Sequence, residues 1–285
     1  MRRLAMIFML GCFAASAMAA GETKAPKPPK PYTVKYAKIK PEFKGDWAAY
    51  WNSPAWKQAN TVTVDQWSTA STETRPGTQV RVLYDETGVR LLWKVEDTYV
   101  VAKARKFLDP VSRDSCVEFF FEPAKHLGYL NLETNAGGTM LWRVQKPVRD
   151  QDVNVTYPPK YQRPPLSPPE DIGLKVQVRK SIPRTVIDPP IETPTTWYIE
   201  SFIPIEVLNY AFGIKPEDLS GASWRGNFYK IIESRELAIA AHRHYGAWSS
   251  IGSKVNFHQP AIFGQIKFEK TPKTNKKTTP RRSAD

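Results

Sequence analysis

The chain has 285 residues, two cysteines and a formal net charge of +13. The excess positive charge lies at the two ends: residues 21–40 hold six lysines and one glutamate, residues 270–285 hold six basic residues and one aspartate, and residues 41–269 are nearly neutral. A nucleic-acid-binding domain normally carries its positive charge on the fold, so this distribution argues against a nucleic-acid partner. The basic ends are expected to be solvated tails that contact anionic surfaces of the cell envelope.

Residues 1–20 have the pattern of a signal peptide, with two arginines, an apolar run and small residues at Ala17 and Ala19. The run is too short to span a membrane, so the mature protein is expected to be secreted or periplasmic. A lipoprotein signal ending at Cys12 is the alternative, although the apolar stretch before that cysteine is shorter than usual. After cleavage Cys116 is the only cysteine, which excludes an internal disulfide.

Residues 21–40 are rich in lysine and proline and are expected to form an extended linker. Residues 41–269 are expected to form one domain, and residues 270–285 a basic disordered tail. Nine segments of the domain have the composition of short strands: 80–84, 89–97, 116–123, 128–135, 139–144, 174–180, 197–205, 223–232 and 263–270. Residues 204–213 predict one short helix that ends at Gly213.

Nine short strands joined by tight turns predict an all-β fold, a β-sandwich of antiparallel strands. Residues 147–171 contain seven prolines and are expected to be a long surface excursion, as is the second proline-rich segment at 183–194. The tryptophan-rich segment 46–56 is expected to plug one end of the sandwich.

The strand CVEFFFE at 116–122 carries two glutamates among aromatic residues. Because side chains alternate along a strand, Val117, Phe119 and Phe121 are expected to face the core, and Glu118 and Glu122 the opposite side. The next strand is expected to add Asn131 and Glu133 to that second face. Carboxylates and amides bond the paired hydroxyls of sugars, while an aromatic ring stacks on a sugar's C–H face.

Other interpretations of this face stay open at the level of sequence. Without other evidence the residues favour an ordinary solvated surface. As a third interpretation, Glu118 with Glu133 could act as the acid and base of a glycan-processing enzyme. The fold class also suits a haem-binding or redox-partner domain, for which Met140 is the candidate axial ligand. The alternating histidines in HRHYG at 242–246 lack a third ligand at a zinc-binding spacing.

The segments VRVLYDE, LLWKVED, DPVSRDSCVEFFFEP, GYLNLETNAGG and NFHQPAIFGQIKFEK, taken in order, resemble the family 9 carbohydrate-binding modules. The resemblance covers most of residues 41–269. It implies a DOMON-like β-sandwich that binds an oligosaccharide or polysaccharide, often at a reducing end, without catalysis. It also implies that Glu118 bonds the sugar and that Asn131 and Glu133 lie on a strand of polar ligands.

The resemblance further implies two stacking tryptophans, and here this sequence departs from the family. Phe257, followed by His258, stands where one tryptophan is expected, and Val111-Ser112 stands where the other belongs. Trp248 or Trp142 is a candidate replacement. The family often holds structural calcium, for which Asp109 and Asp114 are the candidates here, and no other cofactor is expected.

The sequence therefore predicts an exported, non-catalytic carbohydrate-binding protein. Its sugar-binding residues are expected to be Glu118, Asn131, Glu133, Trp248, Phe257 and His258.

Overall fold

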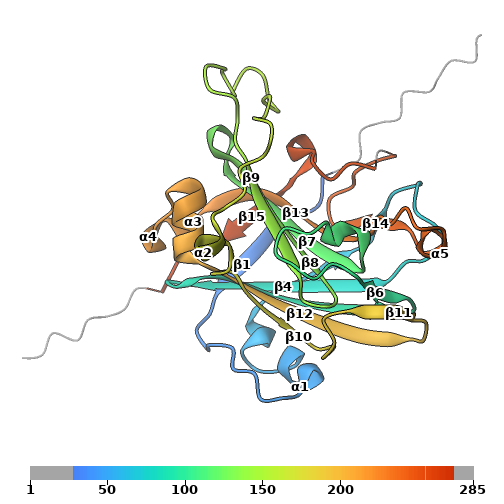
Figure 1. The fold of residues 1–285 in the computed structure, drawn as a ribbon. Helices are drawn as coiled ribbons and strands as arrows, with labels where there is room; N and C mark the ends of the chain where they lie inside the picture. Colours follow the sequence, from blue (N-terminus) through green and yellow to red (C-terminus); the bar gives the residue numbers. More distant parts are fainter. Residues whose placement is uncertain (1–27, 254, 273–285) are drawn as a thin grey trace, which may run out of the picture.

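The computed structural model describes residues 28–253 and 255–272. The expected signal peptide at residues 1–20, most of the C-terminal tail and the first part of the expected linker lie outside these residues. Within them strands are the main secondary structure and helices are few and short, which confirms the all-β prediction (Figure 1). No helix in these two ranges is long and apolar enough to cross a membrane.

All nine predicted strand segments are present, within a few residues of their expected bounds. They are β4 (Gly77–Asp85), β5 (Gly88–Asp97), β7 (Cys116–Ala124), β8 (Gly128–Asn135), β9 (Met140–Gln145), β10 (Gln177–Lys180), β12 (Thr195–Pro204), β13 (Ser223–Ile232) and β15 (Gly264–Phe268). The structure adds β1 (Tyr32–Tyr36), β2 (Thr61–Val64), β3 (Gln66–Trp67), β6 (Val100–Ala102), β11 (Ile187–Ile191) and β14 (His244–Ala247). The prediction of about nine strands was therefore too low.

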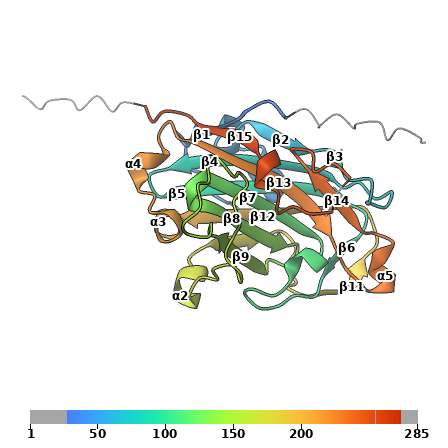
Figure 2. The ribbon, with the colours of Figure 1, turned by 90° about the horizontal axis from the view of Figure 1, so that it is seen from above.

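The principal sheet is nearly closed into a barrel. Its strands follow the order β10-β12-β5-β4-β1-β15-β13-β7-β8-β9, with β2, β3 and β14 paired beside this path. The half from β10 to β4 lies across the half from β15 to β9, as the two orthogonal views show (Figures 1 and 2). The main hydrophobic cluster fills the space between the halves and draws on both, for example Trp93 and Trp197 from one and Phe119 and Phe228 from the other.

Strand β1 joins the two halves and corrects the predicted linker. Tyr32 pairs in parallel with Ile266 of β15, and Lys35 pairs in parallel with Leu83 of β4. The segment was predicted to be linker because lysine and proline surround it, but Tyr32 and Val34 point into the core. The ordered domain therefore begins before residue 41, and the pairing is not wholly antiparallel.

The predicted helix is α3 (Ile205–Phe212). It ends at Gly213, whose φ of 73° is left-handed and favours glycine. The remaining helical elements are short: α1 (Trp47–Trp51), α2 (Glu170–Gly173), α4 (Pro216–Leu219), α5 (Leu237–Ala240), and the 3-10 turns η1 (Trp56–Gln58), η2 (Val111–Arg113), η3 (Lys125–Leu127) and η4 (Pro260–Ile262).

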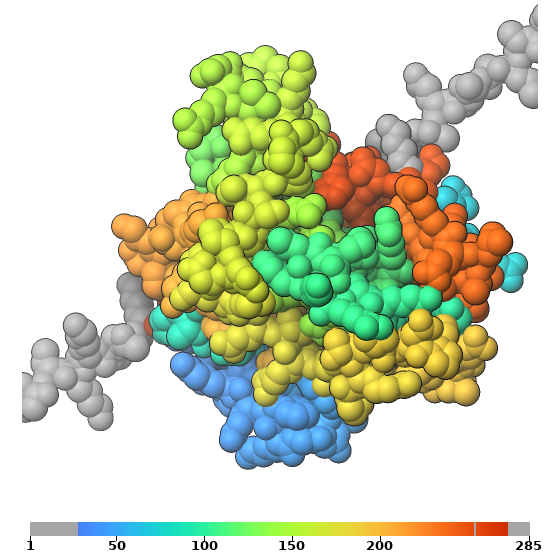
Figure 3. All heavy atoms as spheres, in the orientation of Figure 1, coloured from blue at the N-terminus to red at the C-terminus, as the bar shows by residue number. Residues whose placement is uncertain are grey.

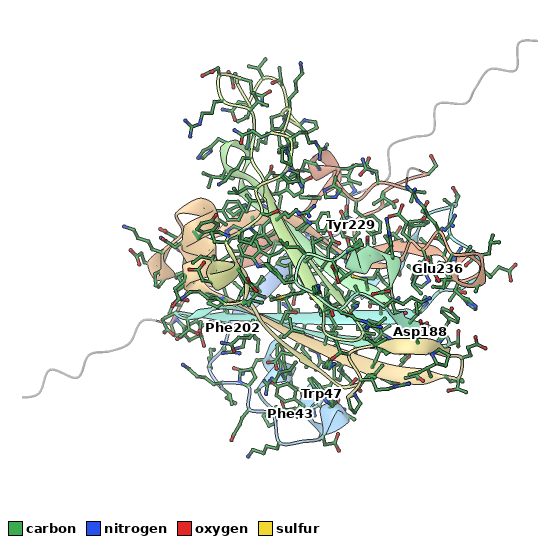
Figure 4. All side chains as sticks on the ribbon, viewed as in Figure 1. Phe43, Trp47, Asp188, Phe202, Tyr229 and Glu236 are labelled. Carbon is green, nitrogen blue, oxygen red and sulfur yellow. The ribbon has the colours of Figure 1, made fainter. Side chains whose placement is uncertain are left out.

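The tryptophan-rich segment does not plug the end of a sandwich. Trp51 and Trp56 pack with Leu92 and Tyr198 in a separate cluster on the outer face of β5 and β12. Figure 4 shows Trp47 on this side of the molecule, across the sheet from Tyr229. A half-sheet that is apolar on both faces needs such a cover, because its outer face carries Leu83, Leu92 and Tyr198.

The long proline-rich segment forms the predicted excursion and stands out from the body in Figure 3. It contains only isolated bridges, between Val144 and Leu166 and between Pro147 and Tyr161, before α2. The second proline-rich segment includes β11, which pairs with β6 in a two-stranded sheet. Proline is tolerated there because such a small sheet consists of edges.

Candidate functional site

The side chains of β7 and β8 alternate as the sequence predicts. Val117, Phe119 and Phe121 lie in the main core cluster, together with Leu130 and Leu132. Glu118 pairs with Glu133 across the two strands, and Phe120 pairs with Asn131, so these four share the opposite face. That face is not an open surface as the sequence suggested, because Glu118, Asn131 and Glu133 are all buried.

A cavity of about 120 Å³ lies over this face. The segment 255–258 covers it from one side, and Ser112 of η2 closes another. Its lining residues are Ser112, Glu118, Phe120, Glu133, Ile231, Glu233, Tyr245, Val255, Asn256, Phe257 and His258. The structure thus brings four of the six predicted site residues to one cavity, with Asn131 directly behind them.

The two central carboxyl groups are held differently. Asn131 Nδ2 donates a hydrogen bond of 2.8 Å to Glu133 Oε1. Glu118 is 2% exposed and accepts no hydrogen bond from the described residues, although it lines the cavity. Burial, with a smaller effect from Glu133 and Glu233, raises the pKa of Glu118 well above its usual range. Burial also raises the pKa of Glu133 to about 7.

Phe257 and His258 form the aromatic wall of the cavity. The ring of Phe257 stacks on Tyr229 with centroids 4.0 Å apart and planes 7° apart, and the Tyr229 hydroxyl donates to the Phe257 carbonyl. One face of Phe257 is therefore covered by Tyr229, and the ring is 6% exposed where it lines the cavity. His258 Nδ1 lies 2.8 Å from the hydroxyl of Tyr129, a contact that fixes the imidazole beside the cavity.

The position opposite Phe257 carries no aromatic ring. Val111 is fully buried in the cluster beneath the cavity, and its neighbour Ser112 lines the wall. The Ser112 carbonyl accepts a hydrogen bond from the Glu233 amide, which ties η2 to the end of β13. The cavity therefore has an aromatic wall at Phe257 and His258 and a small polar residue, Ser112, in the place of a second stacking ring.

Trp248 does not belong to this site. On β14 the residues Tyr245 and Ala247 face the cavity side, so Trp248, one position later, turns toward the opposite face. There it packs on Phe228 and Tyr32 at the edge of the main core. The other candidate replacement, Trp142, is fully buried in the same core and donates to the carbonyl of Gly173.

Several lining residues were not singled out from the sequence. Glu233, Tyr245 and Asn256 reach the cavity from the end of β13, from β14 and from a loop. Strand alternation extended across β13 and β14 would have placed Tyr245 on this face, because Ile231 and Tyr245 are paired. The loop residue Asn256 carried no such periodic signal.

Glu122, the second glutamate of the strand, has a structural role. Its carboxylate accepts a hydrogen bond of 2.8 Å from the hydroxyl of Tyr157 and lies 3.5 Å from Arg225 Nη1. The Tyr157 hydroxyl also lies 2.6 Å from Arg225 Nη1. This cluster anchors the long proline-rich excursion to the sheet, beside the cavity.

The side chains of the two calcium candidates, Asp109 and Asp114, accept hydrogen bonds from other groups of the protein. Asp114 accepts hydrogen bonds from the Lys103 and Ala104 amides and from the Asn135 side chain, and Asp109 accepts from the Arg105 and Lys106 amides. No group of three or more acidic, histidine or cysteine side chains placed to hold a metal occurs in residues 28–253 and 255–272. Both aspartates thus organise the 103–114 loop that leads into η2.

Replacing Asp114 by Ala should lower the free energy of unfolding by about 3 kcal/mol, because three donors lose a buried, charged acceptor. Asp109→Ala should cost less, since this carboxylate is more exposed and bonds two amides. Urea denaturation of both variants and the parent, each with and without EDTA, tests the assignment. A loss of parent stability on adding EDTA would instead identify a bound divalent cation.

For the haem interpretation, the candidate axial ligand Met140 is in a position unsuited to binding haem. Met140 lies in the main core cluster between the two half-sheets, away from the cavity. His244 is fully buried and Cys116 is a buried thiol whose pKa burial raises well above the usual range. These side chains have the surroundings of packed interior residues.

Comparison with known proteins agrees with the geometry. The model of carbohydrate-binding family 9 matches residues 54–268. Among solved structures, a candidate carbohydrate-binding protein from Bacteroides uniformis is 22% identical with a TM-score of 0.66, over 85% of this chain and all of that one.

Two structures of a family 9 carbohydrate-binding module from Caldicellulosiruptor kristjanssonii have the same fold. The complex with cellotriose is 15% identical and the complex with glucose 14%, each with a TM-score of 0.51 over 85% of this chain and 95% or 97% of the module. None of the curated proteins is a significant match. Because the family model covers most of its length, the chain belongs to carbohydrate-binding family 9, whose members bind carbohydrate and carry out no catalysis.

Proposed function

We propose that this protein is exported and binds the end of a glycan in the cavity formed by Glu118, Glu133 and Phe257. The observation that carries the proposal is the convergence of two buried carboxyl groups and one aromatic wall on a single cavity. The carboxyl groups can accept hydrogen bonds from neighbouring hydroxyls, while the ring of Phe257 that lines the cavity packs against the C–H face of a sugar ring.

The size of the cavity favours recognition of a terminal sugar. An engineered cavity of about 150 Å³ holds one benzene molecule, so a cavity of about 120 Å³ suits one ring and not a length of chain. A glycan would enter with one end, its remaining units outside. The reducing end is the candidate, and the structural neighbours crystallised with glucose and cellotriose support a sugar of this general class.

The small wall at Ser112 distinguishes this site from a site with two stacking rings. A single ring gives less contact area with the sugar, so hydrogen bonds from Glu118 and its neighbours must supply more of the affinity. We propose further that the fold is of the DOMON-like sandwich type, that binding needs no cofactor, and that the basic ends contact anionic envelope surfaces. The family assignment sets aside the alternative in which Glu118 and Glu133 form a catalytic pair.

Phe257→Ala should weaken sugar binding about tenfold, because it removes the phenyl ring that segment 255–258 places against the cavity. The measurement is calorimetric titration with plant, algal and bacterial oligosaccharides, glucose and cellotriose included, each with its reducing end intact and after borohydride reduction. Binding that is lost on reduction identifies the reducing end as the ligand.

Trp248→Ala is the matched control, since Trp248 lies outside the cavity and should alter stability more than affinity. If the parent binds no member of the panel, the proposed function is wrong. A haem-binding domain would show a visible absorption band on reconstitution, and Met140→Ala would alter it.

A further inference from the structure

The cavity is lined by several acidic side chains. Three glutamates line it, Glu118, Glu133 and Glu233, and neither lysine nor arginine lines it among residues 28–253 and 255–272. Glu118 and Glu133 are 2% and 7% exposed and stand directly opposite each other on β7 and β8. Glu233 is exposed at the rim.

No lysine or arginine of the described residues forms a salt bridge with the central pair, Glu118 and Glu133. Arg143 of β9 is the strand partner of Asn131 on β8, and its charge lowers the pKa of Glu133. Arg143 does not line the cavity. The buried Lys230 lies on the other face of β13, where it pairs with Asp97.

Glu118 also lacks a hydrogen-bond partner among the described residues, although it is almost fully buried and faces the cavity. A buried carboxylate without a partner is costly, so a ligand that supplies both a donor and a positive charge would be favoured strongly over one that supplies a donor alone. Buried polar groups in proteins nearly always have a hydrogen-bond partner, so the lack of one at Glu118 requires an explanation.

We propose that the cavity prefers a sugar bearing a protonated amine, a terminal amino-hexose, over the neutral sugar of the same stereochemistry. This inference rests on the proposed function and names its ligand class. An ammonium group has three N–H donors and can bridge Glu118 and Glu133, while Phe257 packs against the ring and adds attraction for the cation. A sugar acid is disfavoured by the same carboxylates.

The test is calorimetric titration of the purified chain at pH 7.5, above the pKa of about 7 that Glu133 has in the free protein, with matched trios: glucosamine, N-acetylglucosamine and glucose, then the three corresponding galactose compounds, and 6-amino-6-deoxyglucose. Glucuronic acid is the anionic probe. At least one amine should bind ten or more times as tightly as its neutral and acetylated counterparts, and glucuronic acid should bind more weakly than glucose.

Variants connect the preference to the carboxyl pair. Glu118→Gln and Glu133→Gln should each reduce the ratio of amine to neutral affinity about tenfold, with circular dichroism confirming an unchanged fold. Glu217→Gln, an exposed glutamate on α4, is the charge-matched control and should leave the ratio unchanged.

The outcomes separate the two proposals. Neutral sugars that bind as tightly as the amines overturn the inference and leave the proposed function standing. An amine preference that survives both glutamine variants also overturns the inference, because the pair would not be its source. If neither the amines nor the neutral sugars bind, both proposals fail.

Discussion

Replacing Lys230 by Met is expected to lower the free energy of unfolding by about 3–5 kcal/mol, the usual cost of removing one partner from a buried ion pair. Lys230 Nζ lies 3.4 Å from Asp97 Oδ2, and both side chains are 0% exposed. The variant leaves the Asp97 carboxylate in the core without its cation. Urea denaturation at pH 7 measures the loss.

His244 is a second buried polar group whose hydrogen bond depends on Lys230. Its Nδ1 lies 2.9 Å from the His242 carbonyl and must donate to it, so Nε2 is the atom that accepts from Lys230, 2.8 Å away. The imidazole is therefore neutral, in agreement with a pKa that burial, together with Lys230, lowers well below the usual range. Methionine cannot donate to Nε2, so the variant leaves a second buried group unpaired.

The double variant Lys230→Met with Asp97→Asn provides the control. Asparagine retains the acceptor that Asp97 Oδ1 offers to the Thr98 and Tyr99 amides but carries no charge. We expect the double variant to be more stable than Lys230→Met alone. A single variant that loses less than about 1 kcal/mol would show that the pair contributes little to the fold.

Glu133→Gln is expected to make the protein more stable than the parent by about 3 kcal/mol at pH 8–9 and to have little effect on stability near pH 4. The native pKa of about 7 lies above the ordinary value of 4.5. Between these values the native state retains a proton that the unfolded chain releases, so parent stability falls as pH rises through this window. Each pKa unit of difference corresponds to about 1.4 kcal/mol.

Denaturant unfolding of parent and variant at four pH values from 4 to 9 tests this expectation. Glu118→Gln should act in the same direction, because the pKa of Glu118 is raised too. Glu206→Gln is an exposed control on α3 and should show the parent's pH dependence. Parallel curves for parent and Glu133→Gln would contradict the assignment of a buried, proton-binding carboxyl.

Strand alternation made much of the fold and half of the site predictable. In CVEFFFE the period of two separates Phe119 from Glu118 without any tertiary information, and the β7–β8 turn then sets Glu118 against Glu133. The helix ending at Gly213 was equally local. The resemblance to a known family, which rests on residues in loops as well as strands, added Phe257 and His258.

What the sequence did not reveal depends on tertiary packing. Burial of Glu118 follows from the covering loop at 255–258, and nothing in strand 116–122 specifies that cover. Trp248 was misplaced because a tryptophan near Phe257 in sequence lies on the other face once β14 pairs with β13. Strand β1 was missed because lysines and prolines surround its short YTVKY segment and its partners lie far along the chain.

The parallel pairing of β1 with β15 has a kinetic consequence. Val34 pairs with Phe268, so nearly the whole domain separates the two residues along the chain. Ordering β1 before its partner exists would cost chain entropy without the contacts that offset it, and contacts this distant in sequence slow folding. We therefore expect the seam between the two half-sheets to close late in folding, and a chain interrupted before residue 264 leaves the edges of β1 and β13 that β15 covers open to other strands.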